Sequence, residues 1–231
     1  MCACARQDDA KGLWPRWVLA NSVAETVGLG STFGIGVALF AYLQAPGFLL
    51  ALATAGVAIL AGTLIEGTVV GTAQWLVLRR PFPSMRWRAW VLATATGAFV
   101  AWTLGMLPST LMGAGSGAAG STPAEPSGAV VYSLALLMGL VAGTILGTPQ
   151  WLVLRRYVPR ASFLWVPANA LAWAPGMVLA FYAADFLFAA GPGASTFVLA
   201  MTTLAAIGAI VGAIHVLALV WLVRLRQSAS L

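Results

Sequence analysis

The stretch GTAQWLVLRR at residues 71–80 is repeated with one change as GTPQWLVLRR at residues 147–156. A further Gly-Thr pair lies four residues before the start of each copy, at Gly67 and Gly143. Each extended copy thus has two glycines four residues apart, followed by a glutamine, a tryptophan and two arginines. Glycines at this spacing let two helix backbones approach closely within lipid. Because the glutamine lies on the same helical face, we expect Gln74 and Gln150 to point toward a neighbouring helix.

A degenerate third copy lies near the C-terminus, where Gly208 and Gly212 keep the spacing and His215 takes the place of the glutamine. A second signature, Trp-Val-Leu-Ala-Asn or a close variant, opens each unit at Trp17, Trp90 and Trp165. A motif that recurs at a fixed period indicates internal repeats. We therefore predict one membrane domain that consists of an N-terminal segment (1–16), two-helix hairpin repeats at 17–83, 84–160 and 161–226, and a C-terminal tail (227–231).

The composition indicates a membrane protein. Of the 231 residues, 61% are hydrophobic and 8% are charged, whereas about 25% of residues are charged in soluble domains. Crossing a hydrocarbon core of about 30 Å takes roughly 20 helical residues. Apolar segments of sufficient length run near 17–43, 48–78, 89–107, 129–154, 163–190 and 196–223. The predicted fold is all-α, with six transmembrane helices arranged as three tandem hairpins.

The basic residues predict the orientation of these helices. The connections at Ala45-Pro46-Gly47, at 108–128 and at Gly191-Pro192-Gly193 contain no Lys or Arg, and all twelve basic residues lie in the other segments. The positive-inside rule therefore places both termini in the cytoplasm. Tryptophans beside the basic clusters are expected in the inner membrane interface; they are Trp17, Trp75, Trp87, Trp90, Trp151 and Trp165.

Several function classes are excluded by these features. The net charge of +6 does not indicate a nucleic-acid partner, because apolar segments keep the basic residues apart. Two cysteines, Cys2 and Cys4, can supply neither a disulfide framework nor four zinc ligands. No zinc-helix, aspartyl-dyad or phosphate-loop motif is present. We expect no catalytic residues and no metal site.

Three polar residues within the predicted spans interrupt the repeat pattern. Glu25 corresponds to Ala98 and Trp173 in the other units, and Glu66 corresponds to Ala142 and Ile207. His215 is the third of these residues. At 1.5 Å per residue, Glu25 and Glu66 lie about 12 Å and about 13–14 Å from the inner tryptophans, at nearly the same depth in adjacent helices.

The two glutamates are candidate site residues because intramembrane ionisable groups are expensive to keep. Burial and mutual repulsion disfavour two charges, so we expect at least one glutamate to keep its proton, to share one or to hold a cation. Asn21 and Thr32 follow the same helical stripe as Glu25 and complete a candidate substrate or ion site. In the simpler interpretation, the two protonated side chains hydrogen-bond across a hairpin.

The repeated polar position also has two interpretations. Gln74, Gln150 and His215 either hold helices together by hydrogen bonds or line a polar constriction. His215 alone is a candidate axial ligand for a haem or a chlorophyll-type pigment, although a lone histidine in a helix is more often a hydrogen-bonded core residue. Asp185 is expected near an external loop, in contact with solvent.

The motif resembles that of a group of uncharacterised bacterial multi-pass membrane proteins. The resemblance rests on Gly-x-x-x-Gly-x-x-Gln-Trp-Leu-x-Leu-Arg after a Trp-x-x-Ala-Asn helix start, and it covers nearly the whole chain from Trp17. It implies a bacterial inner-membrane location and no particular function. Mitochondrial carriers also have three hairpins, but their Pro-x-acid-x-x-base signature is missing here.

Two functions fit these features. The first is binding or translocation of a small solute or cation between the hairpin repeats, linked to protons through Glu25 and Glu66. The second is a non-catalytic accessory or scaffold subunit of a larger respiratory or photosynthetic membrane complex that holds a pigment, a haem or a lipid. The glycine faces serve internal packing and homo-oligomerisation equally well.

Overall fold

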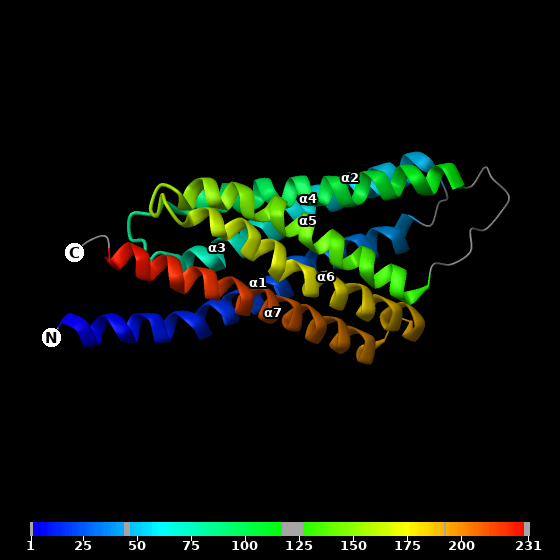
Figure 1. The fold of residues 1–231 in the computed structure, drawn as a ribbon. Helices are drawn as coiled ribbons and strands as arrows, with labels where there is room; N and C mark the ends of the chain where they lie inside the picture. The colour runs from blue at the N-terminus through cyan, green and yellow to red at the C-terminus, as the bar shows by residue number, and fades with distance from the viewer. Residues whose placement is uncertain (1, 44–46, 117–126, 192, 229–231) are drawn as a thin grey trace.

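The protein is an all-helical, integral multi-pass membrane protein. A computed structural model describes residues 2–43, 47–116, 127–191 and 193–228, and six of its helical segments are long and apolar enough to span a bilayer. Figure 1 shows these segments running along one common axis. Because the exposed surface of every span is rich in apolar side chains, a lipid bilayer is its natural environment.

The helices follow the six predicted spans, and the second span is built from two helices. They are α1 (Cys2–Leu43), α2 (Phe48–Ala61), α3 (Gly67–Leu78), α4 (Trp87–Ser116), α5 (Gly128–Leu154), α6 (Trp165–Ala190) and α7 (Ala194–Ser228). A π-helical turn, Gly62–Glu66, joins α2 to α3 within one continuous span. A short 3₁₀ turn, Ser162–Leu164, precedes α6.

Two helix boundaries differ from the prediction. Helix α1 begins at Cys2 rather than near residue 17, because the preceding residues are mostly good helix formers. Helix α4 continues through Pro108 to Ser116 rather than ending at 107. The hydroxyls of Ser109 and Thr110, just after the proline, bond to the carbonyls of Gly105 and Met106 in the same helix. Residues 44–46, 117–126 and 192 of the predicted connections lie outside the described residues.

The spans form a closed ring in the order α1, α3, α4, α5, α6 and α7, and α7 packs against α1. Glycines of the repeated motif form three of the seams. A Cβ atom at Gly67 would lie 2.8 Å from the Cα of Ala95 in α4, and one at Gly208 would lie 2.7 Å from the Cα of Ser22 in α1. A Cβ atom at Gly143 would collide with the backbone of Asn169 in α6. The α7–α1 seam is thus formed by the same close glycine contact as the α3–α4 and α5–α6 seams.

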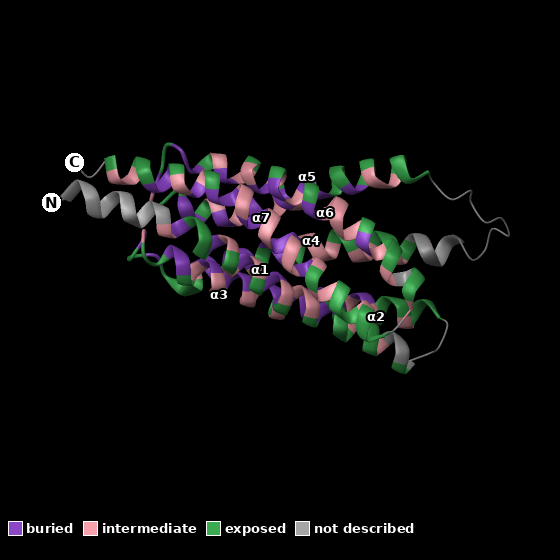
Figure 2. Ribbon diagram, turned by 90° about the horizontal axis from the view of Figure 1, so that it is seen from below, coloured by how far each residue is buried: buried purple, intermediate pink, exposed green. Residues whose placement is uncertain are grey.

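Packing is dense at one end of the ring and sparse at the other. The dense end, here called the arginine end, contains the α3–α4 and α5–α6 connections, the start of α1 and the end of α7 (Figure 1). Buried residues concentrate toward this end, whereas exposed residues predominate at the opposite end (Figure 2). In α1, for example, Phe33, Ile35 and Val37 are 53%, 37% and 69% exposed.

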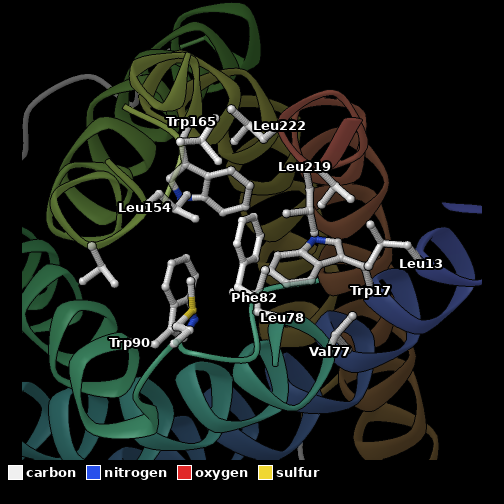
Figure 3. Packing of buried hydrophobic residues seen from close by; sticks show 14 of the residues in the cluster. Leu13, Trp17, Val77, Leu78, Phe82, Trp90, Leu154, Trp165, Leu219 and Leu222 are labelled. Carbon is white, nitrogen blue, oxygen red and sulfur yellow. The ribbon is translucent and has the colours of Figure 1, made fainter. Parts of the chain in front are cut away.

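An aromatic cluster closes the arginine end. Trp17, Trp90 and Trp165 are completely buried, and Figure 3 shows them converging with Phe82 from the α3–α4 connection. The ring of Trp165 lies 5.9 Å from that of Trp17 and 6.1 Å from that of Trp90, with edge contacts in both pairs. These four residues are called the aromatic plug below.

Trp17, Trp90 and Trp165 thus lie inside the ring rather than on its outer surface. Their rings turn inward and fill the end of the ring, and the bundle offers polar partners for the indole N–H of Trp90 and Trp165. By contrast, the guanidinium carbons of Arg79 and Arg155 lie 5.4 and 5.6 Å from the ring centres of Trp75 and Trp151. These two tryptophans are half-buried beside the basic connections, as aromatic residues of a membrane interface are.

Candidate functional site

Gln74 in α3 and Gln150 in α5 have matching hydrogen-bond environments. Trp90 Nε1 donates to Gln74 Oε1 at 3.2 Å, and Trp165 Nε1 donates to Gln150 Oε1 at 2.8 Å. Each tryptophan comes from the helix that follows the glutamine along the chain. A buried amide accepts from a buried indole in both cases, so the plug and the polar layer above it satisfy each other.

The amide nitrogens of the two glutamines bind a second layer of polar residues. Gln74 Nε2 donates to Asn21 Oδ1 at 2.9 Å, and Gln150 Nε2 donates to Thr94 Oγ1 at 3.0 Å. Gln150 Nε2 also donates to Gln74 Oε1 at 3.1 Å, which joins the two sets. Asn21, Thr94 and, on α6, Asn169 each donate to the carbonyl of the tryptophan four residues earlier. The result is a buried network across five helices, α1, α3, α4, α5 and α6.

The third repeat position is different. By analogy with the glutamines, His215 in α7 would accept from Trp17 and donate to Asn169. Instead Trp17 Nε1 and both ring nitrogens of His215 are buried without a hydrogen-bond partner. The His215 ring lies 5.2 Å from that of Trp165, inclined by 36°. An unpaired buried polar group usually costs about 1–3 kcal/mol, so this position is kept at the expense of stability.

We expect His215→Gln to stabilise the fold. A glutamine at this position gains an indole donor and an asparagine acceptor, as Gln74 and Gln150 do, and two such bonds are worth roughly 1–2 kcal/mol in a membrane bundle. Thermal unfolding of the purified protein checks this. A fall in the free energy of unfolding relative to the wild type would contradict the assignment of His215 to the glutamine position.

Glu66 ends the π-helical turn Gly62–Glu66. Such single π turns within α-helices are frequent at functional sites. Trp102 Nε1 in α4 donates to Glu66 Oε2 at 2.8 Å. On the other side, α1 approaches so closely that a Cβ at Gly28 would lie 2.9 Å from the Glu66 Cα. The glutamate is thus held between two helices, with an exposed fraction of 7%.

Glu25 in α1 is more deeply buried, with an exposed fraction of 2%. Its Oε2 atom has no hydrogen-bond partner. No Lys or Arg occurs in residues 17–78, 89–154 or 161–223, so the chain places no basic side chain of its own in these spans. Two buried carboxylates without a counter-charge do not both stay ionised. Either one of them keeps a proton, or a cation lies beside them.

One internal cavity brings the three symmetry-breaking residues together. Glu25, Glu66 and His215 all line it. Gln74, Gln150, Asn21, Asn169 and Thr94 complete its polar wall, and the remaining wall is mostly apolar, with Trp173 on α6. The space open to the centre of a water-sized sphere is about 20 Å³, and one water needs about 10–15 Å³ by that measure.

The size of this cavity limits its contents. It has room for one water or one ion of similar size. A haem or chlorophyll macrocycle does not fit beside His215, so the geometry does not favour the pigment hypothesis. Within the described ranges, no group of three or more His, Cys, Asp or Glu side chains is arranged to hold a metal ion. The cavity therefore suits a single small, hydrogen-bonding occupant.

Comparisons with known protein families, with curated proteins and with solved structures find no match for this chain. Function must be argued from the site itself.

Not every candidate residue lines the cavity. Thr32 is buried, but its hydroxyl donates to the Gly28 carbonyl of its own helix at 3.0 Å, and it does not line the cavity. Other important residues were not predicted. No repeat signature marks Trp102 as a partner of Glu66. Trp90 and Trp165 do belong to a repeated signature, but the sequence indicated a membrane-interface role for them rather than hydrogen bonds to the glutamines.

Proposed function

We propose that this protein binds, and passes across the membrane, a proton or a small monovalent cation at the cavity lined by Glu25, Glu66 and His215. The observation that carries the proposal is that the three ionisable residues that interrupt the repeat pattern line the same cavity. Glu25 Oε2 and His215 offer acceptors without partners there. A cation in the cavity would supply the counter-charge that the chain lacks.

The proposal includes the finer architecture. The three hairpin repeats form the ring, and the arginine end faces the cytoplasm together with both termini, as the basic residues favour. The aromatic plug then separates the cavity from the cytoplasm, while the sparsely packed end provides access from the other side. Passage requires the plug to move. Trp90 and Trp165 are bonded to Gln74 and Gln150, so plug movement and the polar layer are coupled.

Proton or cation flux into liposomes tests the proposal. The purified protein is reconstituted around a pH-sensitive dye, a potassium diffusion potential is imposed, and initial rates are compared with Na⁺, K⁺ or NH₄⁺ outside. We expect Glu66→Gln and Glu25→Gln each to reduce flux at least about tenfold, equivalent to ~1.4 kcal/mol. Both substitutions keep shape and remove the charge.

Thr32→Val is the matched control, because it changes a buried polar residue of α1 outside the cavity. It should retain wild-type flux. Thermal unfolding in each salt separates binding from passage, since a cation that binds the folded state raises its stability. Unchanged flux and an unchanged salt response in the doubly substituted Glu25→Gln, Glu66→Gln protein would refute the proposal.

A second candidate function is that of an accessory or scaffold subunit in a larger membrane complex. It is supported by α1, where consecutive residues near Phe33 and Val37 are exposed and a Cβ at Gly34 or Gly36 would meet nothing within 4 Å. A helix surface of this kind accommodates a further helix. Stable co-purification with other subunits, together with no flux by the protein alone, would favour this function. We propose no catalytic activity under either function.

A further inference from the structure

A second concave site lies on the outer surface of the ring, remote from the central cavity. Its walls come from α5, α6 and α7, and its volume is about 440 Å³. The lining residues are Tyr132, Leu136, Pro175, Val178, Leu179, Tyr182 and Ile210. Val178 lies nine residues after Asn169, which lines the central cavity. Nine residues are two and a half helical turns, so the two side chains point in opposite directions.

The groove follows the second half of α6, where its lining residues from Pro175 to Tyr182 span about 10 Å. Asp185 lies twenty residues after Trp165, about 30 Å along α6, which equals the thickness of the hydrocarbon core. Pro175, at the inner end of the groove, is ten residues before Asp185, or about 15 Å. The groove thus extends from the middle of α6 toward the end opposite the arginine end, and Asp185 follows its last lining residue on α6, Tyr182, by three positions.

A small polar and aromatic group lies at the surface end of the groove. Tyr132 Oη donates to Asp185 Oδ2 at 3.1 Å. The ring of Tyr182 lies 6.2 Å from that of Tyr132 and 5.0 Å from that of Phe186. Of the residues that the structure describes at this end, Asp185 alone is charged. A carboxylate beside aromatic faces attracts an ammonium group.

We propose that this groove binds one phospholipid with a primary-ammonium headgroup, of the phosphatidylethanolamine class. The acyl chain lies against Leu136, Val178 and Leu179, and the ammonium donates to Asp185 beside the ring of Tyr182. An anionic headgroup finds no Lys or Arg in residues 89–154 or 161–223 and is repelled by Asp185. A trimethylammonium headgroup keeps the aromatic contact but has no N–H to donate.

Competitive lipid retention tests this site. The protein is reconstituted with equal amounts of phosphatidylethanolamine and phosphatidylglycerol that carry identical acyl chains, and retained lipids are counted by native mass spectrometry. We expect the wild type to retain roughly two- to fivefold more phosphatidylethanolamine than phosphatidylglycerol, which is the preference that one exposed ammonium contact provides. Asp185→Asn should bring this ratio to about one, and Leu136→Trp, which fills the groove, should reduce retention of both lipids.

Ser133→Ala is the matched control, because Ser133 is an exposed neighbour of Tyr132 whose hydroxyl bonds only within its own helix. It should keep the wild-type ratio. Equal retention of the two lipids by the wild type, a preference for phosphatidylglycerol, or a preference that survives Asp185→Asn would each overturn the proposal. A lipid-free dimer that Leu136→Trp dissociates would also overturn it, since a second copy would then occupy the groove.

Discussion

Replacement of Gly143 by leucine is expected to abolish the folded protein. Even a Cβ atom at this position would collide with the backbone of Asn169 and Ala170 in α6, and backbone cannot move aside as a side chain can. The substitution must separate α5 from α6, and these helices carry Gln150 and Trp165. We expect a loss of about 3 kcal/mol or more in the free energy of unfolding, seen as aggregation or absence of a monodisperse peak in size-exclusion chromatography.

Gly105→Leu in α4 provides the matched control. A Cβ at Gly105 would meet nothing within 4 Å, and leucine is the better helix former. This variant should therefore purify like the wild type. Normal chromatography and unfolding of Gly143→Leu would show that the α5–α6 seam is not as tight as the structure indicates.

Gln74→Leu is expected to destabilise the protein strongly as well. Gln74 takes part in three hydrogen bonds, and its removal leaves the buried Trp90 Nε1 without an acceptor and Asn21 Oδ1 without its donor. Interhelical hydrogen bonds in membranes average about 0.6 kcal/mol each, and a buried orphan adds to that loss. We expect a decrease of roughly 2–3 kcal/mol, measured by denaturant or thermal unfolding in detergent.

His215→Leu tests whether that loss comes from hydrogen bonding. The two positions are equivalent in the repeats, but the nitrogens of His215 have no partner to lose. The leucine variant at 215 should therefore lose much less stability than Gln74→Leu. If both variants lose the same stability, packing rather than the polar network explains the effect.

The helical fold follows from periodicity and composition, and the positions of most elements could therefore be predicted. Apolar runs predicted six spans, and the described part of the chain has six helical segments long and apolar enough to cross a membrane. Glutamine at the seventh position after a glycine was expected to face a neighbouring helix, and Gln74 and Gln150 do bond to residues of other helices. Both inferences depend only on local spacing along one helix, which the sequence displays directly.

Relations between helices were harder to predict. Tryptophans beside basic residues are typical of a membrane interface, but the side chains of Trp17, Trp90 and Trp165 are buried within the closed ring. The bond from Trp102 to Glu66 joins residues 36 positions apart, and no periodicity relates them. Pro108 interrupts the pattern in the sequence, yet α4 continues through it to Ser116, as helices in lipid can. Single-sequence patterns do not contain such information.

The seam between α7 and α1 also determines when the molecule can be completed during synthesis. Ser22 Oγ donates to the Ala205 carbonyl, and 183 residues separate the two. At about 5–20 residues per second, the ribosome needs roughly 10–40 s to make that interval. During this time α3 can already reach Asn21 through Gln74, but the other side of α1 has no partner. The side of α1 that packs on α7 therefore stays without this partner until α7 has been made.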